Sequence, residues 1–234
     1  MNATLPNRCR IVLVAPVGLS GPDLPARLEA ALEGGDVASV ILPQGDLGAD
    51  RFQEAAAPLV SLAQSRGAAV IVAGDTRIAG RLDVDGIHIE GKKEELAEAI
   101  ERFEGKIAVG AGGAKTRDDA LDLGEERPDY IFFGRFGYDE KPEPHPRNLS
   151  LGQWWAEMIE VPAIVAAGSD VESVRLVAET GAEFVALGAA VFGEGKDPRE
   201  AITRANAILD EAPALTEGTE ETSDEDLDEA LDDE

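Results

Sequence analysis

Residues 161–192, VPAIVAAGSDVESVRLVAETGAEFVALGAAVF, contain the pattern that decides the fold class. Two short apolar runs, 162–168 and 183–192, flank a segment whose apolar residues recur with the period of a helix, and Gly181 follows that segment. The runs are continuous rather than alternating, which is typical of parallel strands buried on both faces. The stretch therefore predicts a strand, a helix and a second, parallel strand.

The same unit recurs along the whole chain. Earlier apolar runs lie at 10–16, 39–44, 68–74, 85–91, 106–112 and 129–134. Helical patterns such as LPARLEAALEGGD and KKEELAEAIERFEGK lie between runs and end at glycine. Eight such units predict a single-domain (β/α)8 TIM barrel over residues 9–211. An open doubly wound sheet is the alternative, but APVGLSGPD after the first run lacks the G-x-G-x-x-G spacing of that fold.

The chain is strongly acidic, with a formal net charge of −26 from 47 acidic and 21 basic residues. Residues 217–234 contain 11 of the acids and no basic residue, so the rest of the chain carries about −15. This charge repels nucleic acid and anionic lipid, and we expect neither as a partner. Residues 212–234 are too polar to form a core, which predicts a disordered tail that keeps the protein in solution or binds a protein partner.

Cysteine content and hydropathy indicate the compartment. Cys9 is the only cysteine, which excludes an intramolecular disulfide. No apolar run approaches the length of a membrane span, and the first residues lack the pattern of a signal peptide. We expect a cytoplasmic protein, and the sequence leaves open whether it forms a homo-oligomer.

Small residues after the last two predicted strands are candidates for phosphate binding. In this class of barrel, phosphate groups favour the loops after strands seven and eight. Gly168 and Ser169 follow the seventh run, and Gly188 and Ala189 lie in the eighth. Exposed backbone N–H groups at such turns bind anions. The alternative is that these glycines only allow tight turns.

Other candidate side chains carry weaker signals. Asp75 follows the third run, where it could hold a metal or a polar substrate group, or cap the next helix. His88 lies inside the fourth run, a position more typical of a hydrogen-bonded core residue than of a catalyst. His145 lies among prolines, which indicates an exposed loop.

Three stretches together resemble a known family. They are DVDGIHIEG (83–91), RPDYIFFGRFGYDEKP (127–142) and the opening stretch 161–192. In their order and spacing they are similar to thiamine phosphate synthase and to its relative, the thiazole tautomerase. The resemblance implies a transferase of thiamine biosynthesis that joins a pyrimidine pyrophosphate to a thiazole phosphate with Mg²⁺ and releases pyrophosphate.

The resemblance also implies roles for particular residues. The family's phosphate-binding turns match Gly168 with Ser169, and Gly188 with Ala189. A lysine of the loop after strand six matches Lys141, and Lys115 stands where the family has other polar groups after strand five. The metal-binding aspartate after strand three matches Asp75. A small phosphorylated ligand and Mg²⁺ are thus the implied ligand and cofactor.

The sequence departs from the family pattern where pyrophosphate is expected. The ILPQG segment (41–45) lacks two family cations, and Lys93 stands near the position of a second metal-binding aspartate. Three hypotheses therefore stay open. The chain is an enzyme of the synthase type, a non-catalytic barrel with a degenerate site that binds a phosphorylated ligand as a sensor or partner subunit, or another phosphate-handling barrel enzyme.

Overall fold

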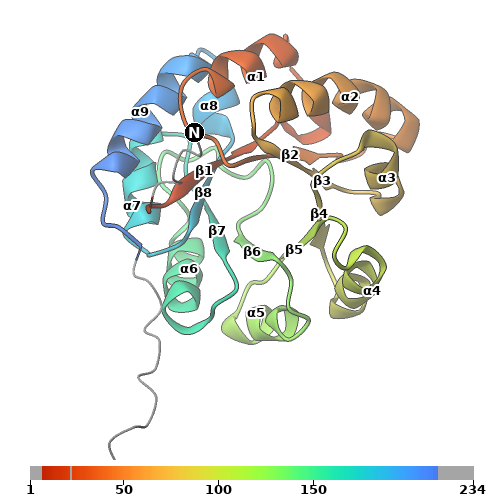
Figure 1. Cartoon of the computed structure of the whole chain (residues 1–234). Coiled ribbons are helices and arrows are strands. Elements are labelled where there is room, and N and C mark those ends of the chain that lie inside the picture. The colour runs from red at the N-terminus through yellow and green to blue at the C-terminus, as the bar shows by residue number, and fades with distance from the viewer. Residues whose placement is uncertain (1–6, 22, 216–234) are drawn as a thin grey trace, which may run out of the picture.

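The computed structural model describes residues 7–21 and 23–215. In these ranges eight parallel strands form a closed barrel surrounded by helices, which confirms the predicted fold (Figure 1). The strands are β1 (Arg10–Val14), β2 (Ser39–Pro43), β3 (Ala69–Ala73), β4 (Gly86–Glu90), β5 (Ala108–Gly112), β6 (Tyr130–Phe133), β7 (Ala163–Ala166) and β8 (Phe184–Leu187). From residue 216 onward, the predicted acidic tail lies outside the described residues.

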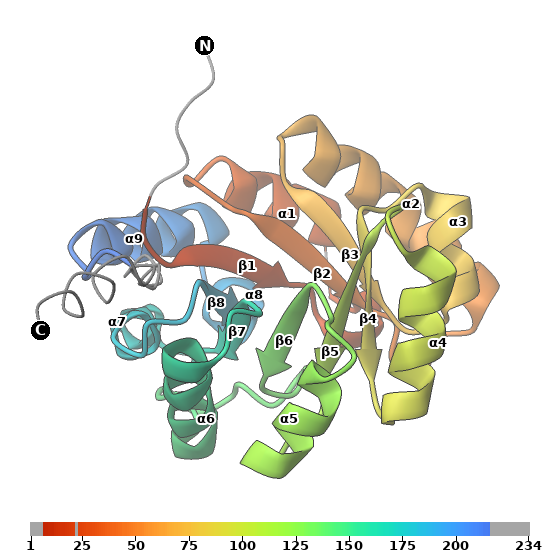
Figure 2. The same ribbon diagram turned by 60° about the horizontal axis from the view of Figure 1, so that its bottom comes forward.

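Helices follow the strands in sequence and cover the outside of the barrel (Figure 2). The α-helices are α1 (Leu24–Leu32), α2 (Ala49–Ser65), α3 (Ala79–Leu82), α4 (Lys93–Phe103), α5 (Arg117–Gly124), α6 (Pro146–Met158), α7 (Val174–Ala178), α8 (Ala189–Phe192) and α9 (Pro198–Asp210). Short 3-10 turns η1 (Val17–Leu19), η2 (Thr76–Ile78) and η3 (Val171–Ser173) lie in the connections. In the described part of the chain, no helix has both the length and the apolar character needed to cross a membrane.

The barrel closes between β1 and β8, where Val12 pairs with Ala186 in parallel register. The eighth apolar run differs from the prediction, because β8 ends at Leu187 and the same run continues as the short helix α8. Gly188 separates the two with a φ of −119° and a ψ of −84°. Ala-Ala-Val-Phe suits a strand or a helix equally, and only the end of the barrel decides between them.

Alternate residues of each strand enter two different cores. Ile11 and Leu13 of β1 point outward and join the large cluster between strands and helices. Val12 and Val14 point inward and join the cluster in the barrel interior, which also contains Ile41, Ile71, Tyr130, Phe132, Ile164 and Ala186. This inward and outward alternation is general for small barrels. The interior is therefore packed, and a ligand site can form only at its ends.

Two glycines of β5 make room for large polar side chains inside the barrel. A Cβ on Gly110 would lie 1.9 Å from Tyr130 Cζ, and a Cβ on Gly112 would lie 2.6 Å from His88 Nε2. Such separations are far below van der Waals contact, so glycine is required at both positions. Glycine is a weak strand former, but the two glycines of β5 leave the space in which His88 and Tyr130 lie side by side beneath the barrel mouth.

Candidate functional site

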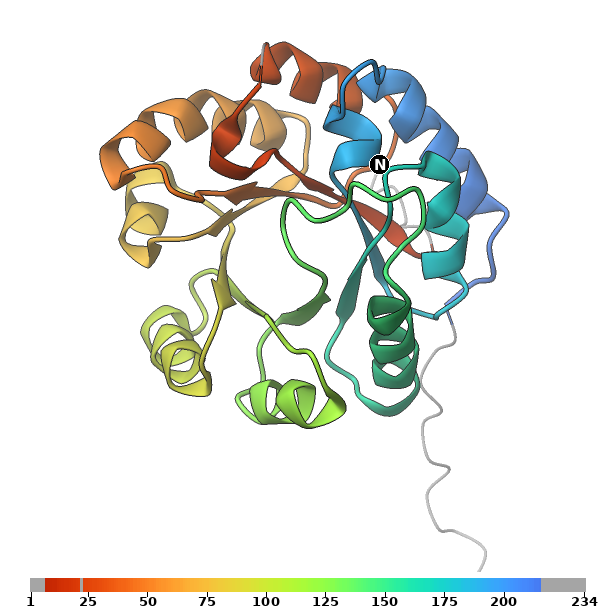
Figure 3. The ribbon, with the colours of Figure 1, turned by 180° about the vertical axis from the view of Figure 1, so that it is seen from behind.

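The connection between β6 and α6, residues 134–145, lies across the end of the barrel near α7 and α8 (Figure 3). It contacts both turns that the sequence predicts to bind phosphate. Lys141 O accepts a hydrogen bond from Ser169 N at 2.7 Å. Asp139 Oδ2 accepts one from Ala189 N at 2.6 Å. The structure therefore brings the residues predicted for phosphate binding together, with the connection on top of them.

Three further polar groups of the turn after β7 are also engaged by the chain itself. Pro142 O accepts a hydrogen bond from Asp170 N at 3.2 Å, and Ser169 Oγ donates to Glu140 O at 2.9 Å. Gly168 N donates to Ser173 Oγ at 3.0 Å. The Asp139 carboxylate stands in for the oxygen of an external anion at Ala189 N. Phosphate binding at these turns stays a prediction, and in this conformation it would displace the connection.

The glycines of the two turns are explained by the closeness of the connection. A Cβ on Gly168 would lie 2.1 Å from Pro142 O and 2.6 Å from Lys141 O. A Cβ on Gly188 would lie 2.6 Å from Asp139 Oδ2. The backbone and the carboxylate of the connection can approach this closely only because both side chains are absent.

The two predicted lysines are exposed, and their contacts come from backbone atoms. Lys141 contributes its carbonyl to Ser169, as described above. Lys115 N donates to Asp119 Oδ2 at 3.0 Å, next to the capping box that Thr116 and Asp119 form at the start of α5. Neither lysine borders the large pocket described below. Their catalytic roles remain predictions.

Asp75 caps the turn that follows it and forms an ion pair with a neighbour. Its Oδ1 accepts from Arg77 N at 2.9 Å, and its Oδ2 lies 2.7 Å from Arg77 Nη2. The side-chain hydrogen bond from Arg77 and the backbone bond lower the pKa of Asp75 to about 2. Of the two roles expected for Asp75, the structure therefore shows the helix cap.

A magnesium ion does not fit this arrangement without a change. Within the described ranges, no group of three or more His, Cys, Asp or Glu side chains could hold a metal ion. Mg²⁺ is often held by one or two carboxylates together with phosphates and water. For such a site Asp75 would first have to leave Arg77, so a metal role for Asp75 stays a prediction.

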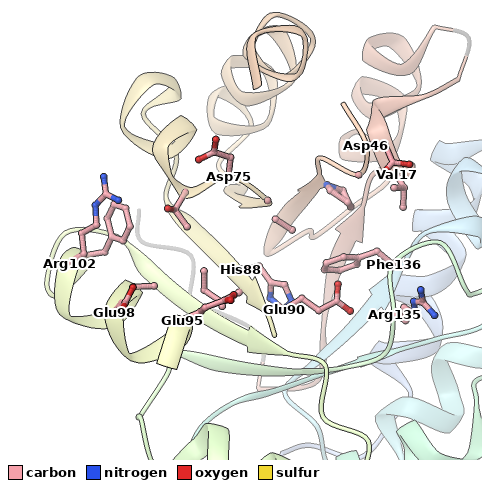
Figure 4. Close-up of a pocket in the computed structure, with 18 of the residues that line it drawn as sticks. Val17, Asp46, Asp75, His88, Glu90, Glu95, Glu98, Arg102, Arg135 and Phe136 are labelled. Carbon is pink, nitrogen blue, oxygen red and sulfur yellow. The ribbon is translucent and has the colours of Figure 1, made fainter. Parts of the chain in front are cut away.

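A pocket of about 970 Å³ opens at the ends of β2, β3 and β4 (Figure 4). Its acidic border residues are Asp46, Asp75, Glu90, Glu95 and Glu98. Its basic border residues are Arg102 and Arg135. Of the five carboxylates, only that of Asp75 has an ion-pair partner among residues 7–21 and 23–215. The pocket is therefore a predominantly negative site.

His88 lies in the middle of this pocket in Figure 4 and is 2% exposed. Its Nδ1 and the Tyr130 hydroxyl are 3.0 Å apart, and Phe136 meets its ring at 5.1 Å in an edge-on arrangement. Burial lowers the pKa of His88 to about 3 and raises the pKa of Tyr130. The imidazole is therefore neutral at physiological pH. His88 was predicted to be a hydrogen-bonded core residue, and its burial and the hydrogen bond at Nδ1 confirm this.

Sequence analysis missed the part of the pocket that comes from α4 and from the β6–α6 connection. Glu95 and Glu98 lie in the first two turns of α4, and Phe136 and Tyr138 lie in the connection. A signal for α4 was present, because in a (β/α)8 barrel the start of each helix faces the same end as the strand before it. No comparable signal placed the aromatic residues of the connection.

A closed barrel of eight parallel strands surrounded by helices is a (β/α)8 barrel, and its candidate sites lie at the C-terminal ends of the strands, where barrels of this class bind their ligands. The family model for thiamine monophosphate synthase matches residues 11–191, and the chain belongs to this family. The resemblance seen in the sequence is thereby confirmed.

Two relatives support the family assignment. A thiamine-phosphate synthase of Rhodospirillum centenum is 31% identical over 202 residues, covering 86% of this chain and 98% of the relative. A thiamine-phosphate synthase of Erythrobacter litoralis is 28% identical over 188 residues, covering 78% and 88%. Among solved structures, a thiamine phosphate pyrophosphorylase from Pyrococcus furiosus superposes with a TM-score of 0.73 at 21% identity. The superposition covers 89% of this chain and 98% of the pyrophosphorylase, and it supports the assignment of the barrel fold.

Proposed function

We propose that this chain is a small-ligand-binding member of the thiamine monophosphate synthase family that does not carry out the synthase reaction. The observation that carries the proposal is the charge of the large pocket. A departing pyrophosphate gathers negative charge, and enzymes stabilise it with cations or metal ions. Here Asp46, Glu90, Glu95 and Glu98 border the pocket without ion pairs among the described residues.

The two arginines at the pocket border are outnumbered by its carboxylates, and each lies on an aromatic ring. Arg135 stacks on Tyr138, with its guanidinium carbon 3.9 Å from the ring centroid. Arg102 lies over Phe103 at 5.1 Å, and both arginines lie at the edges of the close-up in Figure 4. Carboxylates at the border of a pocket raise the free energy of a pyrophosphate bound in it, because like charges repel.

Formation of thiamine phosphate from both substrates and Mg²⁺, resolved by chromatography, tests the proposal. The Rhodospirillum centenum relative serves as the positive control because the two chains match over nearly its whole length. We expect product from the relative and none above background from this chain. Product formation by this chain at a rate near that of the relative would overturn the proposal.

Synthase activity is the second candidate, favoured by the near-complete match to a relative named for that activity. In that case Gly168, Ser169, Gly188 and Ala189 hold the phosphate after the β6–α6 connection has moved away. Lys141 and Lys115 then contact the anionic substrates, and Asp75 binds Mg²⁺ after it has left Arg77. The same chromatographic assay decides between the two candidates.

A further inference from the structure

We propose that the Asp139 carboxylate holds the β6–α6 connection closed over the turns after β7 and β8, and that the connection opens as one unit. Opening uncovers the backbone N–H groups of these turns and, in the same movement, takes Tyr138 away from the β2–β4 pocket. Access to one half of the barrel mouth thus changes the shape of the other half. This control of access goes beyond the proposed function and holds for either candidate function.

The connection, residues 134–145, takes part in both halves of the barrel mouth. On the β2–β4 side, Phe136 and Tyr138 border the large pocket. On the β7–β8 side, Asp139 and Lys141 accept hydrogen bonds from backbone N–H groups of the turns. Tyr138 and Asp139 are neighbours in the sequence, so a peptide bond joins the pocket border to the closed turns. A displacement of Asp139 therefore moves Tyr138 as well.

Asp139 makes a contact that differs in kind from the others. Its Oδ2 accepts a hydrogen bond from Ala189 N at 2.6 Å. Other contacts between the connection and the turns use backbone carbonyls, and they run from Ser169 N to Lys141 O at 2.7 Å, from Asp170 N to Pro142 O at 3.2 Å and from Ser169 Oγ to Glu140 O at 2.9 Å. A hydrogen bond to an ionised carboxylate is stronger than one between neutral groups. Asp139 is therefore the group whose loss should weaken the closed state most.

The Asp139 contact is also reversible. The side chain is partly buried, and it forms no ion pair with any residue in the ranges 7–21 and 23–215. Glu140 and Glu143 of the same connection are exposed acids, so the local charge does not favour a carboxylate at this place. When the carboxylate leaves Ala189 N, water replaces the hydrogen bond, and the net cost is small compared with that of a buried ion pair.

The backbone of the connection allows movement at its β6 end and restricts it at its α6 end. Gly137 has a φ of +75°, a conformation that glycine adopts without strain, in a turn that Tyr138 N closes by donating to Arg135 O at 3.2 Å. Pro142 and Pro144 fix the backbone φ further along, and Pro144 is buried. Opening therefore turns about Gly137 and breaks the hydrogen bond of Tyr138 N.

Amide hydrogen exchange, followed by nuclear magnetic resonance on the full chain, tests the proposal because it reports local opening at each N–H group. The variant Asp139→Ala removes the carboxylate. We then expect the amides of Ser169, Asp170 and Tyr138 to exchange about tenfold faster than in the wild type, after correction for neighbouring side chains. The amide of Ala167 donates to a carbonyl of β8 at 3.0 Å inside the barrel sheet and should keep its rate.

Two further variants separate the contact from its charge. Asp139→Asn keeps an oxygen acceptor without the charge, and we expect it to speed exchange at the same amides by only about threefold. Glu143→Ala removes an exposed acid of the same connection and should leave the rates unchanged. If Asp139→Ala does not fold, the comparison of Asp139→Asn with Glu143→Ala decides the question.

The pattern of exchange rates can contradict the proposal in several ways. Faster exchange at Ala189 alone would show that the contacts open independently, and it would overturn the proposal. The same increase at Ala167 as at Ser169 would identify a general loss of stability and would also overturn it. Faster exchange at Ser169 and Asp170 with an unchanged rate at Tyr138 would confine the opening to the β7–β8 side and contradict the link between the two halves.

Discussion

The two sides of the barrel mouth differ in how far the protein satisfies its own polar groups. At the ends of β7 and β8, backbone N–H groups are bonded to the β6–α6 connection, and Asp139 occupies the place of an anion. At the ends of β2, β3 and β4, a large pocket keeps four of its five border carboxylates without ion-pair partners from the described residues. Polar groups that the fold leaves unpaired are the ones free to bind a ligand, so we expect the β2–β4 side to be the more accessible of the two.

The largest effect is expected from filling the space between Gly168 and the connection. Gly168→Ala places a methyl group 2.1 Å from Pro142 O, so the free energy of unfolding should fall by about 2–3 kcal/mol. Chemical denaturation measures this. Gly80→Ala in α3 is the matched control, because a Cβ there meets nothing within 4 Å. Equal stability of the two variants would show that the closed side is looser than described.

Removing the Asp139 carboxylate should free the backbone N–H group of Ala189 to bind an external anion. Asp139→Ala leaves Ala189 N without its partner and should cost about 1.5–2 kcal/mol of stability. Inorganic phosphate should then raise the melting temperature of Asp139→Ala more than that of the wild type. Glu143→Ala, an exposed acid of the same connection, is the control. No gain in the phosphate effect would remove Asp139 as a competitor for the turns.

On the β2–β4 side, the buried His88 should make the free energy of unfolding depend on pH. Burial lowers the pKa of His88 from 6.5 to about 3, so below pH 6.5 the unfolded chain binds a proton that the folded chain does not. Stability is therefore greatest above pH 6.5 and falls as the pH decreases toward 3. Between pH 6.5 and 5 the loss is about 1.5 kcal/mol, and His88→Gln should lack it. Parallel stability curves for the two proteins would contradict a buried neutral His88.

The smallest effect on stability is expected at Asp75. Arg77 is exposed, so Arg77→Ala should leave the melting temperature unchanged, because exposed ion pairs contribute little. The pKa of Asp75 should rise toward its ordinary value, as the hydrogen bonds that lower it are lost. Titration by nuclear magnetic resonance measures the change. An unchanged pKa would show that Arg77 is not its cause.

The barrel was predictable because its signal is local. Continuous apolar runs and glycine stops appear in every unit, and each can be recognised without knowledge of the others. The capping role of Asp75 was likewise predictable, since its partner Arg77 is two residues away. The helix at 189–192 was not, because its residues suit a strand equally and only the barrel end decides.

The state of the candidate site could not be predicted, because it depends on contacts between distant segments. Asp139 meets Ala189 across fifty residues of sequence, and the carbonyl groups of Lys141 and Pro142 carry no sequence signature at all. The four residues predicted for phosphate binding do come together, but nothing in the sequence indicated that the chain would engage their amides. The negative charge of the pocket could not be predicted either, because the fold brings together acidic residues from β4, α4 and two connections.

Calorimetric titration of the wild-type chain and of Asp139→Ala with inorganic phosphate, under matched ionic strength, tests the contrast between the two sides most directly. The account predicts saturable phosphate binding to Asp139→Ala and none to the wild type, because Asp139 accepts the hydrogen bond of Ala189 N that an external anion would need. Saturable phosphate binding to the wild type would contradict it.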